Sequence, residues 1–120
     1  MAGLTVKQFD NPDETRTPDK TKVQVVNLGA GTAARLSVEP GWRWSECIKP
    51  VVGGDSCQAH HVGVIISGTM HVAHNDGTEA DLTAGSAYEI LPGHDAWVVG
   101  DAPAVSFEFD SSTAATYAKK

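Results

Sequence analysis

Short runs of apolar and β-branched residues, separated by turn residues, dominate the chain from Val23 onward. The runs are too short for helices of useful length, and glycine, proline or asparagine bounds most of them. This pattern is typical of strands. The predicted strands cover residues 23–28, 33–38, 42–48, 58–66, 69–74, 78–82, 86–91, 96–99 and 104–109. Many short strands at near-regular spacing predict an all-β sandwich or barrel.

Turn residues and a polar segment divide the chain further. Asn75-Asp76-Gly77 predicts a tight hairpin, because asparagine and glycine tolerate the positive φ that such turns need. Residues 10–22 hold two prolines and alternating charges without apolar periodicity, which is typical of a loop or an extended arm. We therefore expect an N-terminal polar arm (1–22), a barrel (23–110) and a C-terminal tail (111–120) with one short helical turn.

Length and charge restrict the function. A chain of 120 residues is long enough for one domain with a real core. The net charge of -6 leaves no basic face to neutralise phosphates, which argues against a nucleic-acid partner. The chain has no apolar run of signal-peptide or membrane-span length, so we expect a cytoplasmic protein without a membrane partner. In that compartment Cys47 and Cys57 would be reduced thiols.

The stretch "SCQAHHVGVIISGTMHV" (56–72) carries the candidate metal chemistry. Because alternate residues of a strand face one side, Cys57 and His61 share a face, and His60 lies on the other. We predict that His61 points into the barrel and His60 away from it. Cys57 and His61 would be about 13 Å apart on an ideal strand, so they can share an ion only if the chain bends between them.

The segment "GVIISGTMHV…DGTEADLTAGSAYEILPGHDAW" resembles the conserved core of the cupin superfamily. The resemblance covers roughly residues 36–109 and implies a jelly-roll-like β-barrel with a pocket at one mouth. The endings "PGHDAWVVGDAP" and "ATYAK" resemble a bacterial cupin subgroup whose members mostly lack an assigned reaction. Since the superfamily includes dioxygenases, isomerases, epimerases, decarboxylases, storage proteins and sugar sensors, the resemblance implies a fold more than a function.

The two cupin metal motifs map onto this chain with changed ligands. In the first motif the glutamate position falls on His61. In the short-spacing register the nearer histidine position falls on Cys57 and the farther one on Asp55, whereas the long-spacing register gives Ser56 and Gly54, which are not useful ligands. In the second motif the histidine position falls on Ala96, and the nearest imidazole is His94. The three-histidine, one-glutamate iron or manganese site that the resemblance implies is therefore absent as written, which argues against oxygenase chemistry.

Cys57, His61 and His94 remain as candidate metal ligands. Thiolate and imidazole donors suit zinc first, with nickel, copper or iron as alternatives, and Cys47 is a further thiol that could point into the same space. A metal-free alternative stays open. In it, His61 is a pocket histidine bonded to Tyr88, Glu89 or a ligand, and the cysteines are small buried hydrophobes.

Aromatic residues suggest a small-molecule site at the barrel mouth. Trp42 and Trp44 lie two apart on one face of a predicted strand, and Trp97 follows His94. With Arg43 and Tyr88 they form the candidate ligand-binding set, although the tryptophans could equally fill the barrel or a dimer interface. His71 and His74 flank the predicted hairpin and are expected at the surface.

Three functions are compatible with these residues. The first is a small-molecule-binding barrel, with or without a non-standard divalent metal site, and the second is a metal-dependent enzyme such as an isomerase, lyase or dioxygenase. The third is a structural or interaction barrel with a degenerate site. Val62, Val64 and Ile66 form an apolar outward set, which predicts a homodimer.

Overall fold

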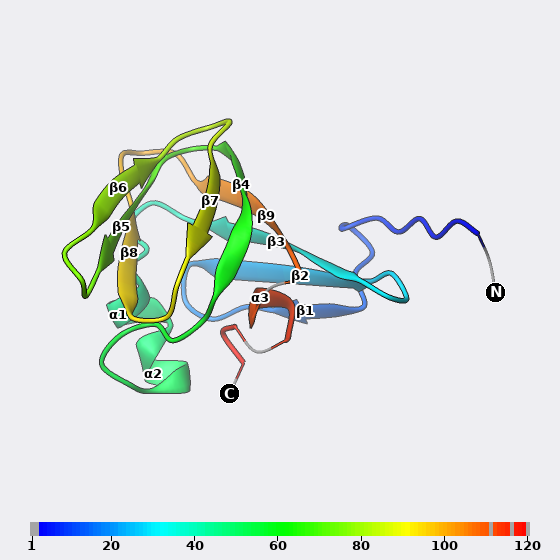
Figure 1. The fold of residues 1–120 in the computed structure, drawn as a ribbon, viewed down its shortest axis with the longest axis horizontal. Coiled ribbons are helices and arrows are strands. Elements are labelled where there is room, and N and C mark those ends of the chain that lie inside the picture. The colour runs from blue at the N-terminus through cyan, green and yellow to red at the C-terminus, as the bar shows by residue number, and fades with distance from the viewer. Residues whose placement is uncertain (1–2, 111, 116, 120) are drawn as a thin grey trace.

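A computed structural model describes residues 3–110, 112–115 and 117–119 of the chain. Two antiparallel sheets face each other and form a barrel-like sandwich (Figure 1). The strand order is β1-β2-β3-β9-β4-β7 in the larger sheet and β6-β5-β8 in the smaller one. The strands are β1 (Glu14–Arg16), β2 (Thr21–Asn27), β3 (Thr32–Val38), β4 (His61–Ser67), β5 (Met70–His74), β6 (Glu79–Leu82), β7 (Ala87–Ile90), β8 (His94–Val98) and β9 (Ala104–Phe109). The predicted all-β jelly-roll barrel is confirmed.

The core lies between the two sheets. Inward residues of β2 and β3 and of β5 and β8 belong to one buried cluster that also contains Ile65 of β4. These inward residues are Val23, Val25, Leu36, Val38, Met70, Val72, Ala96 and Val98. They occur at every second position of their strands, which is the period that a sheet with one buried face requires.

The predicted strand at residues 42–48 is wrong. This segment contains the short helix α1 (Trp44–Cys47), and a second short helix, α2 (Lys49–Val52), follows it; both lie at one end of the barrel (Figure 1). Trp44, Cys47 and Ile48 are buried and follow the i, i+3, i+4 spacing of a helix face rather than strand alternation. Trp42 and Trp44 therefore do not share a strand face.

The other predicted strands are present with shifted ends, since β4 begins at His61 rather than at residue 58 and β8 at His94 rather than at residue 96. The hairpin between β5 and β6 turns at residues 75–77, where Gly77 has a φ of 95° and donates its N–H to the carbonyl of His74.

Within the predicted arm, β1 pairs with the edge of β2, and β2 itself begins at Thr21. Residues 1–2 of the arm and 111, 116 and 120 of the predicted tail lie outside the described residues, and α3 (Ser112–Ala115) lies in that tail. None of the described helices is long and apolar enough to cross a membrane.

The arm covers part of the outer face of the larger sheet. The ring of Phe9 stacks on that of Phe107 in β9 with 5.2 Å between centroids, and Asp10 accepts a 2.6 Å hydrogen bond from Arg35 of β3. Before this contact the N-terminal segment extends away from the barrel (Figure 1), and its Leu4 and Val6 are 78% and 71% exposed. The neighbouring part of the same face, over β4, carries exposed apolar side chains.

Gly63 of β4 is required by close packing against β9. A Cβ atom at this position would overlap the carbonyl oxygen of Phe107 and lie 2.8 Å from Cγ of Glu108. The absence of a side chain therefore makes room for the Glu108 side chain inside the barrel.

We predict that Gly63→Ala destabilises the protein by about 3 kcal/mol, because the backbone of β9 must shift to accept the methyl group. Urea unfolding measures this loss. Gly3→Ala is the matched control, since a Cβ at Gly3 meets open space, and it should change stability by less than about 0.5 kcal/mol. Equal stability of the Gly63→Ala variant and the wild type would contradict the packing described here.

Candidate metal centre

His61 begins β4 and points into the barrel. It is 4% exposed, whereas the adjacent His60 keeps 42% of its side chain exposed and lies 2.9 Å from the carboxylate of Glu89. Neighbouring residues of an extended chain face opposite sides, so the predicted orientations of the two imidazoles are confirmed.

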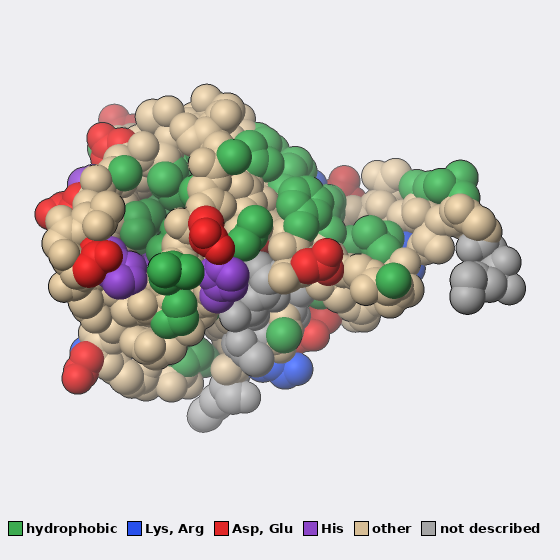
Figure 2. Space-filling view, in the orientation of Figure 1, with side chains coloured by type: hydrophobic (Ala, Val, Ile, Leu, Met, Phe, Trp, Pro, Cys, Tyr) green, Lys and Arg blue, Asp and Glu red, His purple; other side chains and the backbone are tan. Residues whose placement is uncertain are grey.

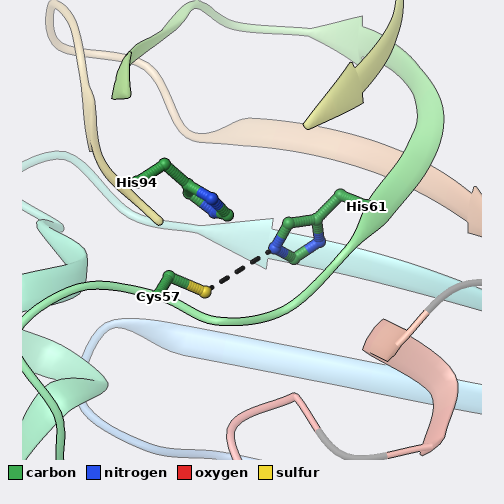
Figure 3. A group of neighbouring side chains, drawn as sticks. All are labelled: Cys57, His61 and His94. Atoms are coloured by element: carbon green, nitrogen blue, oxygen red, sulfur yellow. Dashed lines mark hydrogen bonds between the residues drawn. The ribbon is translucent and has the colours of Figure 1, made fainter. Parts of the chain in front are cut away.

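Cys57 reaches His61 because the chain bends before β4. Cys57 forms an isolated bridge with His94, in which the Cys57 N–H donates to the His94 carbonyl at 2.7 Å. Regular β4 pairing starts only at His61. As a result Sγ of Cys57 lies 3.9 Å from Nε2 of His61, far closer than the distance along an ideal strand (Figure 3).

His94 completes the cluster from the other sheet. It is the first residue of β8, directly after Gly93, whose φ of 104° favours glycine in the turn. Its ring lies edge-on to that of His61, with 5.2 Å between centroids. One possible donor atom from each of Cys57, His61 and His94 lies within 4.8 Å of the other two, and all three residues are buried.

Hydrogen bonds orient both imidazoles. Nδ1 of His61 lies 2.8 Å from Oε1 of Glu108, and Nδ1 of His94 lies 2.9 Å from the carbonyl oxygen of Leu91. A carbonyl oxygen can only accept, so the His94 Nδ1 carries a proton and donates it. In each ring this engagement leaves Nε2 as the atom available to a thiol or a metal, as is usual for histidines that bind metals.

Glu108 and Thr113 are site residues that the sequence analysis missed. Glu108 is buried in β9, accepts hydrogen bonds from the Thr113 hydroxyl and, at 2.8 Å, from the Tyr88 hydroxyl, and lies opposite Gly63. Thr113 Oγ1 also lies 2.7 Å from Nδ1 of His61. Glu108 therefore ties the imidazole of β4 to β7, β9 and α3.

The C-terminal segment covers this group. The buried Arg16 of β1 donates from Nη1 to the carbonyl oxygens of Thr113 and Tyr117, at 2.9 and 2.8 Å. The Tyr117 ring then lies edge-on to His61, with 5.2 Å between centroids. One guanidinium thus holds two points of the segment over the donor cluster.

The electrostatics of the site favour a thiolate beside an imidazolium. Burial alone would raise the pKa of the Cys57 thiol, but hydrogen bonds and charge from His61 and His94 outweigh burial and lower it to about 6. Burial would lower the pKa of His61, but the charge of Glu108 and the hydrogen bonds to Cys57 and Glu108 raise it to about 9. The pKa of Glu108 is lowered, because the charge of His61 and three hydrogen bonds outweigh its burial.

Two spaces adjoin the cluster. An internal cavity of about 20 Å³ is lined by residues that include His61, His94, Glu108, Trp42 and Tyr88. A second hollow of about 440 Å³ lies beside α2 and is lined by Cys57, Trp44 and Tyr117 among others. The first space has room for little more than a water molecule, whereas the second is large enough for a small organic molecule.

The predicted ligand-binding residues lie in two places. Trp42 and Trp44 are buried in the core, and Tyr88 is half-buried; all three line the small cavity. Trp97 and Arg43 lie together away from it, with the guanidinium carbon 4.2 Å from the centroid of the indole ring.

The remaining candidates lie outside the cluster. Cys47 is buried with its Sγ 3.8 Å from a carboxylate oxygen of Asp19, and both cysteines are free thiols. Asp55, the farther motif position, is exposed. His71 and His74 are half-buried rather than exposed, because acidic neighbours and, for His71, the Trp97 ring pack against them.

The fold is that of cupins. The chain resembles the polyketide cyclase RemF from Streptomyces resistomycificus (TM-score 0.64, 11% identity, 90% of this chain and 79% of that one). It also resembles a cupin-like protein from Thermotoga maritima (TM-score 0.52, 15% identity, 88% and 80%) and an oxalate oxidase in complex with glycolate (TM-score 0.58, 18% identity, 89% and 59%). The chain thus spans about three fifths of that oxidase chain. Neither a family model nor a curated protein sequence matches it significantly.

We predict that Glu108→Gln raises the pKa of the Cys57 thiol. Loss of the carboxylate lowers the pKa of His61 by roughly 1–3 units, and a neutral imidazole stabilises the thiolate less than an imidazolium does. Ultraviolet thiolate absorbance followed across pH, in a Cys47→Ala background, measures the shift.

Glu89→Gln is the control for this prediction, because Glu89 contacts the half-buried His60 outside the barrel. It should leave the thiol pKa unchanged. An unchanged thiol pKa in the Glu108→Gln variant would show that Glu108 does not control the charge of His61.

Proposed function

We propose that this chain is a metal-binding cupin whose ion is held by Cys57, His61 and His94. The observation that carries the proposal is the orientation of the two imidazoles, whose Nδ1 atoms contact Glu108 and the Leu91 carbonyl while a thiol lies beside His61 Nε2. Carboxylate or carbonyl partners of this kind orient histidines that bind metals and raise their basicity.

The donor set fits a borderline-soft divalent ion. One thiolate and two imidazoles are preferred zinc ligands, and nickel, copper and iron are the alternatives. The lowered pKa of Cys57 supports the proposal, since a thiol must lose its proton before it can bind a metal. The raised pKa of His61 acts against it, so the ion must displace the proton on Nε2 of that ring. When bound, such an ion would supply Lewis acidity, while His61 and His94 would stay oriented by the hydrogen bonds of their Nδ1 atoms.

We further propose that a small molecule approaches the centre from the hollow beside α2. This hollow is about 440 Å³ and includes Cys57 in its wall, so it leads to the thiol side of the cluster. The internal cavity is too small for an organic ligand, so Trp42 and Trp44 would contact such a molecule only if the barrel opened.

An enzyme is the second candidate function. Solved structures similar to this chain include proteins named oxalate oxidase, oxalate decarboxylase and polyketide cyclase, which supports a metal-dependent enzyme such as an isomerase, lyase or dioxygenase. The nearly filled barrel supports the third function, an interaction barrel, but a degenerate site would not need the buried His61–Glu108 pair. Two free thiols support a cytoplasmic location.

Metal content tests the main proposal. We predict that protein purified without a histidine tag binds about one zinc ion per chain, and that His61→Ala abolishes this binding. Glu108→Gln should weaken zinc binding roughly 10- to 100-fold, because the carboxylate orients the ligand rather than binding the ion. Elemental analysis and zinc titration measure both effects.

His60→Ala is the matched control, since His60 neighbours His61 in the chain but lies outside the barrel. It should keep full zinc binding. Equal zinc binding in the wild type, His61→Ala and His60→Ala, or none in any of them, would return the protein to the metal-free class.

Homodimerisation is the proposed assembly. On β4, Val62 and Ile66 are 39% and 43% exposed, and Val64 pairs with Phe107 of β9 on the same outer face. Hydrophobic side chains gather on the surface over β4 and β9 (Figure 2). The inner positions of the same two strands hold His61 and Glu108. Part of the outer face is therefore more apolar than the interior beneath it, and this supports burial of that face against a second copy.

We predict that the double variant Val62→Glu/Ile66→Glu shifts the protein from dimer to monomer, because like charges would have to be buried unpaired. Light scattering at micromolar concentration measures the change. Val99→Glu, at an exposed apolar residue outside this face, should leave the dimer intact. A wild-type protein that is only monomeric would remove the proposed assembly.

A further inference from the structure

The indole N–H of Trp42 is buried and has no hydrogen-bond partner in the described part of the chain. Trp42 is 2% exposed, so bulk water does not reach it. Buried donors in native proteins are nearly always paired with protein or with an ordered small ligand. A missing partner is therefore expected next to Nε1.

The small internal cavity is the place where such a partner fits. Trp42 lines this cavity together with His61, His94 and Glu108. Its volume of about 20 Å³ exceeds the roughly 10–15 Å³ that one water requires, and it is far below the roughly 300 Å³ at which organic-ligand pockets begin. The partner is thus one or two heavy atoms in size.

A second polar group in the cavity wall supports a polar occupant. The hydroxyl of Ser106 is buried and makes no hydrogen bond of good geometry, although it is close enough to Tyr88 to oppose the rise in the pKa of that phenol. A water molecule in a protein interior usually contacts two to four polar groups. Trp42 and Ser106 would supply two of them.

We propose that the cavity holds a single water-sized oxygen ligand, water or hydroxide, that accepts a hydrogen bond from Nε1 of Trp42 beside His61 and His94. A small anion such as cyanide could take its place. The inference rests on the proposed function where it places this ligand next to the metal, because three protein donors leave one position of a tetrahedral site to an exogenous ligand. Trp42 is then a positioning donor rather than a stacking surface.

Nuclear magnetic resonance of protein with ¹⁵N-labelled indoles tests the cavity ligand without any activity assay. The chain has three tryptophans, so the Trp42 signal is identified by its loss in Trp42→Phe. We expect magnetisation transfer from a long-lived water to the Trp42 indole proton in metal-free protein, and a shift of that signal when zinc is added. Absence of the water contact in both metal-free and zinc-loaded protein overturns the inference.

Cyanide binding to cobalt-substituted protein gives the second measurement. Trp42→Phe should weaken cyanide roughly 10- to 100-fold, as loss of a hydrogen bond to a charged ligand does, and should leave cobalt affinity unchanged. Trp44→Phe is the matched control. Trp44 lines the same cavity, but its indole nitrogen is not among the buried polar atoms that lack a hydrogen-bond partner in the described residues. It should change neither affinity.

The outcomes separate the two proposals. Failure to bind zinc or cobalt, with a long-lived water still at Trp42, overturns the metal centre and supports the cavity ligand. If Trp42→Phe, Trp44→Phe and the wild type bind metal normally and bind cyanide with equal affinity, the proposed role of Trp42 is overturned and the metal centre is not.

Discussion

The contact between His61 and Glu108 is the interaction on which the rest of this site depends. Both side chains are almost fully buried, and their nearest atoms are 2.8 Å apart. Charges taken out of water are costly unless they are paired and their remaining hydrogen-bonding groups are satisfied. The hydroxyls of Thr113 and Tyr88 donate hydrogen bonds to the Glu108 carboxylate, and Gly63 leaves space for it. The contact with Glu108 fixes the orientation of the His61 ring, on which the donor cluster at Nε2 depends.

This constraint links segments far apart in the chain. The carboxylate belongs to β9, the imidazole to β4 and the covering hydroxyl to α3, which Arg16 of β1 holds in place through backbone carbonyls. The inner side of these strands is polar, whereas part of their outer side is apolar. The N-terminal arm covers some of this apolar surface, and the rest would be available to a second copy. The buried polar pair and the exposed apolar surface, which we propose as a dimer contact, are therefore two sides of the same strands.

Much of the fold and part of the site could be predicted from local pattern. Strand alternation is sufficient to separate His61 from His60, and the positive φ that Gly77 adopts explains why the β5–β6 hairpin was predictable. The strand predicted at residues 42–48 was wrong because a mixed seven-residue segment fits either period, and only the burial of Trp44, Cys47 and Ile48 shows the helical one. Glu108 was missed for a stronger reason. In "AVSFEF" the apolar residues Val105, Phe107 and Phe109 suggest the inward face, yet Glu108 and Ser106 occupy it.

The central claim is that Cys57, His61 and His94 together bind one metal ion. X-ray absorption spectroscopy at the zinc edge of zinc-loaded protein tests it most directly, because sulfur and nitrogen neighbours differ in distance. The account predicts one sulfur at about 2.3 Å and at least two imidazole nitrogens at about 2.0–2.1 Å, with the sulfur lost in Cys57→Ala. A first shell of nitrogen and oxygen only, or a sulfur that remains in Cys57→Ala, would contradict it.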